Sequence, residues 1–203
     1  MKENNYFWKV LINPFRFVAG GKALFFGFLV MALLVVLAFL ADIGFDGVLD
    51  MHYGCGEREK SFLPHIYCIF GSWIIAVAVF YVTALIAAGK KVRIVDIAGT
   101  FALAKTPLLI NALLAFLPVA KIMCGMDLTN ISSPETMQQL MLTLLKVSPL
   151  LIVNVIILIW YIVLMYNAYS VSANIKGAKG ILTFIAALLV SEILSKVFLV
   201  FVL

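Results

Sequence analysis

Long apolar stretches separated by short polar segments dominate the chain. A helix needs about 20 apolar residues to cross the hydrocarbon core of a bilayer. Five stretches reach that length, at residues 23–41, 66–88, 97–120, 147–169 and 180–203. In lipid each must be helical, because backbone N–H and C=O groups find no water to bond. The pattern therefore predicts an all-α, polytopic integral membrane protein with five transmembrane helices.

The first stretch, residues 23–41, resembles the apolar part of a signal peptide. It is longer than the roughly 7–15 residues usual for such a region, and four more apolar stretches follow it. We therefore expect a retained membrane helix.

Composition agrees with lipid as the solvent. Hydrophobic residues make up 65% of the chain and charged residues 12%, against about 45–50% and 25% in soluble domains. The net charge of +5 is spread over several short loops, so it does not indicate binding to nucleic acid. Three cysteines are too few for a disulfide framework.

The basic residues of the loops divide unevenly between the two sides of the membrane. One side would hold Lys2, Lys9, Arg16, Lys22, Lys90, Lys91, Arg93, Lys176 and Lys179. The other would hold Arg58, Lys60, Lys121 and Lys146. Cytoplasmic loops carry the excess of lysine and arginine. We therefore predict a cytoplasmic N-terminus and a C-terminus outside.

Two segments are predicted to lie along the membrane surface. Residues 6–17 mix aromatic and basic side chains, which favour the headgroup region, and Pro14 should break any helix there. Residues 132–135 read Ser-Ser-Pro-Glu, a helix start. The helix after it would gather apolar residues on one face, and Pro149 would open the fourth span. That face comprises Met137, Leu140, Met141, Leu144 and Leu145.

Three stretches together resemble the Yip-domain family, five-span membrane proteins first met as Ypt/Rab-interacting proteins and also found in bacteria. The first is Leu-Ile-Asn-Pro-Phe-Arg-Phe at residues 11–17. The second, residues 97–107, runs from a glycine to a proline in the third span, which is entered from a basic loop. The third joins Trp160-Tyr161 to the turn at residues 176–180. With the spans, this resemblance covers most of the chain.

The resemblance implies a cytoplasmic interfacial segment at residues 1–22 and a five-helix membrane domain at residues 23–203. It also implies a role in membrane organisation or trafficking. Only about 22 residues precede the first span, whereas eukaryotic members have a long N-terminal region used in partner binding. We therefore expect a bacterial-type member in the inner membrane.

Polar residues inside the spans are the candidate binding residues. Ionisable groups in lipid cost a few kcal/mol and tend to face partners or cavities. Counted along their helices, Asn111, Asn154 and Glu192 fall at similar depths near the midplane, and Lys196 lies one turn beyond Glu192. They could form an ion relay or a polar pocket. Alternatively, they could hold helices together through hydrogen bonds, each worth about 1 kcal/mol.

Lys105, in the third span, is expected to extend its long side chain to the cytoplasmic headgroups, with Asp96 as a partner.

The segment between the first two spans contains further polar candidates. Asp42, Asp46 and Asp50 recur every four residues and would share one face of a helical continuation, or form a solvated acidic loop. The same segment begins a pattern of paired His-x2-Cys motifs, which have the ligand types of a zinc site. Its members are His52, Cys55, His65 and Cys68. A disulfide between Cys55 and Cys124 is another hypothesis. Unpaired cysteines without a special role are favoured first, then the disulfide, then the zinc site.

No catalytic motif is present. The chain lacks His-Glu-x-x-His, a phosphate-binding glycine loop and Gly-x-Ser-x-Gly, and both histidines lie between the first two spans, away from Ser191 and Ser195. We expect a non-enzymatic membrane component, without cofactor or bound metal, that binds partner proteins or organises the bilayer. Its partners would be the lipid bilayer and a membrane protein or further copies of itself. The alternative is a small transporter or channel-like protein with a site at Glu192.

Overall fold

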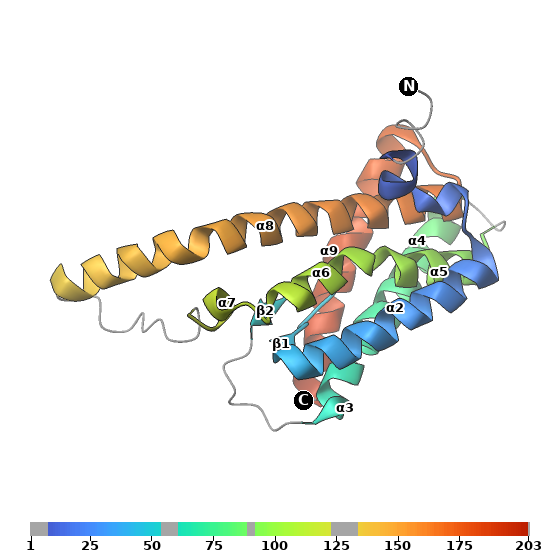
Figure 1. Cartoon of the computed structure of the whole chain (residues 1–203). Coiled ribbons are helices and arrows are strands. Elements are labelled where there is room, and N and C mark those ends of the chain that lie inside the picture. Colours follow the sequence, from blue (N-terminus) through green and yellow to red (C-terminus); the bar gives the residue numbers. More distant parts are fainter. Residues whose placement is uncertain (1–7, 54–60, 89–91, 123–133, 203) are drawn as a thin grey trace.

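The computed structural model describes residues 8–53, 61–88, 92–122 and 134–202, which are mainly helical (Figure 1). Within these ranges, five helical segments are long and apolar enough to cross a membrane. They are Gly20–Ala41, Phe62–Ala88, Ile94–Leu114, Met137–Ala173 and Gly177–Val202. Each corresponds to one of the five predicted stretches. The prediction of an all-α chain with five helices long and apolar enough to span a membrane is therefore confirmed.

The elements follow the chain in this order. A short 3-10 helix η1 (Pro14–Arg16) precedes α2 (Gly20–Ala41), which leads to strands β1 (Ile43–Gly44) and β2 (His52–Tyr53). The second span is built from α3 (Phe62–Ile66), the π-helical turn η2 (Tyr67–Gly71) and α4 (Ser72–Ala88). Then come α5 (Ile94–Ala104), α6 (Thr106–Leu114), α7 (Pro118–Ile122), α8 (Pro134–Ala173) and α9 (Gly177–Val202).

The third span, α5 with α6, lies at the centre of the bundle. It contacts α2, α4 and α8. In the most apolar 18 residues of this span 61% of the residues are buried, against 22–33% in the corresponding stretches of the other four spans. Side chains on this span therefore meet protein on most sides, while those on the other four largely face the surroundings.

Small residues bring α2 and α5 unusually close. A Cβ atom at Gly99 would lie 2.6 Å from the backbone nitrogen of Leu24 and 2.8 Å from the carbonyl oxygen of Gly20. A Cβ atom at Gly27 would lie 2.7 Å from the backbone nitrogen of Leu103. Lipid tails are as apolar as the side chains of the helices, so the hydrophobic effect does not drive helices together in a membrane. Close packing of this kind stabilises their association instead. These two glycines therefore set the spacing of the two helices.

The third span is interrupted at Lys105, where α5 ends and α6 begins. Pro107 has no N–H for the carbonyl of Leu103, four residues before it. The Thr106 hydroxyl donates to that carbonyl instead, at 2.6 Å. The interruption therefore leaves no orphaned carbonyl at Leu103.

The third span also ends earlier than predicted. The helix stops at Leu114 rather than 120, and α7 starts separately at Pro118. Pro118 cannot donate to the carbonyl of Leu114, which accepts instead from the backbone N–H of Leu117 at 3.0 Å. The predicted boundary of 97–120 was wrong for this reason.

The fourth span belongs to one helix, α8, which starts at Pro134 and passes through Pro149. The prediction that Pro149 separates a surface helix from the span was therefore wrong. Pro149 has no N–H to donate to the carbonyl of Leu145, four residues before it. That carbonyl accepts a hydrogen bond from the Ser148 hydroxyl instead, at 3.0 Å. The first part of α8 extends well beyond the other helices (Figure 1).

The N-terminal segment packs against α8. Residues 8–12 are helical, and the helix ends before Pro14, as predicted. The Trp160 indole donates to the carbonyl of Leu11 at 3.1 Å, and the Asn167 amide donates to that of Ile12 at 2.9 Å. Phe15 is buried. Two of the stretches that carry the family resemblance are therefore in contact.

The spans run back and forth between two ends of the bundle (Figure 1). We call the end where α2 begins and α4 ends the basic end, because its described cations include Arg16, Lys22, Arg93, Lys176 and Lys179. We call the opposite end, where α2 passes into β1 and β2, the hairpin end.

Candidate functional site

The segment that follows α2 folds back against the bundle as a short hairpin. Asp42 ends α2 in a left-handed conformation, with φ of 53°. β1 and β2 then pair antiparallel, Ile43 with Tyr53 and Gly44 with His52. Ile43, Phe45 and Val48 are buried. The three aspartates therefore do not share a helical face, because the helix ends at Ala41, and of the two alternatives the loop is the one observed.

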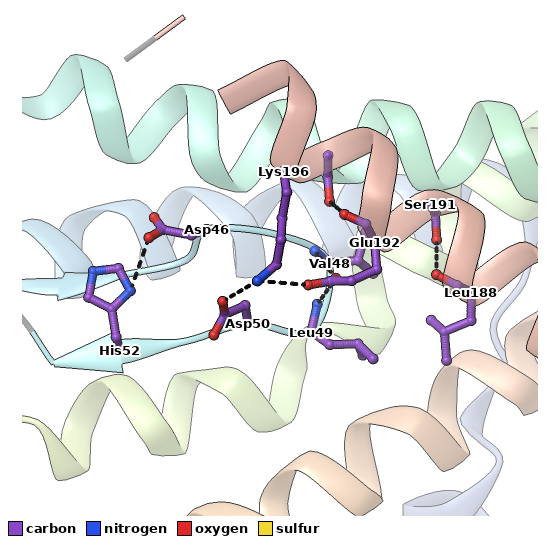
Figure 2. A network of polar contacts seen from close by, with 10 residues as sticks. Asp46, Val48, Leu49, Asp50, His52, Leu188, Ser191, Glu192 and Lys196 are labelled. Atoms are coloured by element: carbon purple, nitrogen blue, oxygen red, sulfur yellow. Dashed lines mark hydrogen bonds and ion pairs between the residues drawn. The ribbon is translucent and has the colours of Figure 1, made fainter. Parts of the chain in front are cut away.

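Glu192 of α9 holds the tip of this hairpin (Figure 2). Its Oε2 atom accepts hydrogen bonds from the backbone N–H groups of Val48 and Leu49, both at 2.9 Å. Successive N–H groups in a turn form a concavity that suits an anion. A Cβ atom at residue 47 would lie 2.6 Å from the Oε1 atom, so the glycine there gives the carboxylate room.

Charged side chains surround this contact (Figure 2). The Lys196 Nζ atom lies 2.6 Å from Oδ2 of Asp50 and 3.8 Å from Oε1 of Glu192. His52 Nδ1 lies 3.2 Å from Oδ2 of Asp46. Two carboxylates and an ammonium group thus meet where the hairpin tip contacts α9.

Asn154 of α8 bonds the hairpin rather than another span. Its amide nitrogen lies 2.8 Å from the Tyr53 hydroxyl oxygen, and its Oδ1 atom lies 3.1 Å from the same oxygen. Burial raises the pKa of the Tyr53 phenol above its ordinary value of 10.0, and the hydrogen bond with Asn154 opposes that shift. The phenol therefore stays protonated near neutral pH and can donate to Asn154.

The predicted residues are brought together only in part. Glu192 and Lys196 are neighbours, as the i,i+4 spacing indicated. Asn111 is 2% exposed, and its Oδ1 atom accepts no hydrogen bond in the described part of the chain. Hydrogen bonds among the described residues connect Glu192 and Asn154 to the hairpin, not to Asn111 or to each other.

Lys105 is buried, with 4% of its surface exposed. Its Nζ atom lies 3.5 Å from the Ser72 hydroxyl and 6.0 Å from the centre of the Tyr161 ring, and it is near enough to Glu192 to interact electrostatically. Asp96 instead faces Arg93, at 3.9 Å. The prediction that Lys105 reaches the headgroups was wrong, because α5 and α6 form the central span.

Replacing Lys105 with methionine is expected to leave the thermal stability of the detergent-purified protein unchanged or to raise it. A methionine fills similar space, and a buried ammonium group with weak partners is costly to desolvate. Lys105→Glu, which places a second carboxylate near Glu192, should lower the melting temperature. A large loss of stability in Lys105→Met would show that the ammonium group stabilises the core.

The zinc and disulfide hypotheses rest partly on residues outside the described ranges, Cys55 and Cys124. Of the other members, His65 packs edge-to-face on Phe39, with ring centroids 6.1 Å apart, and Cys68 is buried. The described residues contain no group of three or more histidine, cysteine or acidic side chains placed to hold a metal ion. Both hypotheses stay predictions.

Sequence reasoning missed the part that the hairpin plays. Asp50, Tyr53 and the backbone of residues 48–49 contact predicted site residues, but none was a candidate partner for Glu192 or Asn154. A signal was present, since residues 43–53 interleave apolar residues with Gly44 and Gly47. A loop in water does not need such apolar residues, whereas a loop packed on the bundle does.

Comparison with known proteins adds no relative: no family model, no curated protein and no solved structure matches this chain.

Proposed function

We propose that this chain is a non-enzymatic component of a bacterial inner membrane that binds a partner membrane protein. The basic end faces the cytoplasm and the hairpin end faces outward, as the distribution of lysine and arginine favours. The resemblance to Yip-domain proteins supports a role in organising the membrane.

The observation that carries this proposal is that several polar side chains of the spans, Asn111 excepted, are engaged within the chain. Glu192 binds the hairpin backbone, Asn154 binds Tyr53, and Trp160 and Asn167 bind the N-terminal segment. The hydroxyl group of Ser191 donates to a carbonyl of its own helix. Side chains used in this way hold the fold together and are not available as a row of ligands for a solute.

The first part of α8 supplies a surface for a partner. Its 40 residues measure about 60 Å, twice the roughly 30 Å hydrocarbon thickness. The first part of α8 extends beyond the bundle (Figure 1), and it carries exposed apolar side chains. They are Met137, Met141, Leu142, Leu144 and Leu145. A helix of a partner membrane protein that likewise extends beyond the bilayer would cover this face.

The test is site-specific photo-crosslinking in native membranes. A benzoylphenylalanine at Leu145, on the extension of α8, should yield a discrete protein adduct. The matched position is Leu182, an equally exposed residue of α9 (68% and 67% exposed), which should yield only lipid adducts. Lipid adducts alone at both positions would contradict the proposal.

The alternative function is a small transporter or channel-like protein with its site at Glu192. The buried Lys105, near enough to Glu192 for electrostatic interaction, favours it. Ion or proton flux in proteoliposomes that disappears in Glu192→Gln, while the variant stays folded, would support this alternative over the first proposal.

A further inference from the structure

We propose that the groove between α2 and the third span binds an anionic phospholipid, with one acyl chain in the groove and the headgroup at Lys22. The inference adds a specific ligand to the proposed membrane component. It rests on that proposal only for placing the site in the cytoplasmic leaflet.

The groove is apolar and lies on the surface of the bundle. Its volume is about 440 Å³. Phe26, Leu29 and Leu33 of α2 form one wall, and Leu103 and Thr106 belong to the other. The Thr106 hydroxyl already donates to the carbonyl of Leu103. The described lining of the groove therefore leaves no hydroxyl donor that an occupant would have to pair with, which suits a hydrocarbon chain.

The lining of the groove suits an acyl chain along its length. Phe26 to Leu33 spans about 10 Å of helix, and apolar side chains of α2 line the groove over that length. The charge beside the groove, rather than its volume, favours a lipid over a helix from another protein.

Charge at the basic end of the groove determines the headgroup. Lys22 is exposed and precedes Phe26, Leu29 and Leu33 by four, seven and eleven residues, so it shares their face of α2. Arg16 is also exposed and lies two residues before Val18, which lines the groove.

These two cations have no acidic partner in the described part of the chain. Neither Arg16 nor Lys22 forms an ion pair there. Asp96, the acidic residue in the first turn of α5, lies 3.9 Å from Arg93. The charge of Lys22 is therefore available to a phosphate group, next to a groove that takes the chain attached to it.

Native mass spectrometry of the detergent-purified protein tests the site. Dioleoyl phosphatidylglycerol and dioleoyl phosphatidylcholine are added in equal amounts, and the ratio of bound species is measured. We expect the wild type to prefer phosphatidylglycerol and Lys22→Gln to lose about fivefold of that preference, the factor for about 1 kcal/mol per basic residue near anionic lipid. Lys179→Gln, which removes an exposed cation of α9, is the control and should keep the preference.

A second pair of variants tests the groove itself. Leu29→Trp, which fills the groove, should reduce binding of phosphatidylglycerol, whereas Leu182→Trp on the exposed face of α9 should not. Glycerol phosphate without acyl chains should fail to displace the bound lipid. Equal binding of the two lipids by the wild type, equal losses in Lys22→Gln and Lys179→Gln, unchanged binding in Leu29→Trp, or displacement by glycerol phosphate would overturn the proposal. None of these results depends on the cross-linking at Leu145.

Discussion

Replacing Glu192 with leucine is expected to release the hairpin tip and to destabilise the protein by about 3 kcal/mol. The variant leaves the N–H groups of Val48 and Leu49 without their acceptor, and each unsatisfied buried group costs about 1–3 kcal/mol. For a chain of this length the melting temperature should fall by roughly 6–12 °C. Thermal unfolding of the purified protein in detergent measures the change.

Two further variants distinguish the contribution of the Glu192 carboxylate to stability from that of the neighbouring ion pair. Glu192→Gln keeps an acceptor oxygen but loses the charge, so its melting temperature should lie between those of the wild type and Glu192→Leu. Lys196→Met removes a pair whose side chains are 50% and 42% exposed, and exposed pairs are worth under about 1 kcal/mol. If Lys196→Met were as unstable as Glu192→Leu, the ion pair rather than the backbone contact would anchor the hairpin.

Gly99→Val is expected to disrupt the packing of α2 on α5 and to cost about 3 kcal/mol or more. The added side chain would meet the backbone of Leu24 and Gly20, which cannot rotate away as a flexible side chain can. The purified yield and the melting temperature in detergent should both fall. Gly27→Val should act in the same way, because its Cβ would meet the backbone of Leu103.

Gly21→Ala is the matched control for this prediction. It lies in the first turn of α2, and a Cβ atom there would meet nothing within 4 Å. Alanine is also the better helix former, so the variant should be as stable as the wild type or more stable. Equal stability of Gly99→Val and Gly21→Ala would mean that α2 and α5 do not pack as closely as described.

The spans could be predicted from the sequence because lipid imposes a simple requirement. Twenty apolar residues without water must be helical, and nothing in tertiary structure overrides that. The limits of the spans were less predictable at prolines. The hydroxyls of Thr106 and Ser148 each donate a hydrogen bond to a carbonyl for which the next residue, a proline, has no N–H. In spite of this shared feature, the third span is interrupted at Lys105, whereas α8 continues through Pro149.

The candidate site could be predicted only in part, because depth along a helix does not give direction around it. Glu192 and Lys196 are related by one helical turn, so their proximity follows from local spacing. Asn111 and Asn154 were predicted to lie at similar depths, but Asn154 bonds Tyr53, whose position depends on the fold of a loop. The burial of Lys105 depends on which span is central, and a run of apolar residues does not reveal this.

The arrangement of the two ends across the membrane underlies both proposals, and thiol labelling of intact cells tests it most directly. In a protein whose native cysteines are replaced, a cysteine at Ser61, beside the start of α3, should react with a membrane-impermeant maleimide added outside. A cysteine at Lys179, at the basic end, should react only after permeabilisation. Labelling of both positions from the same side would contradict the account.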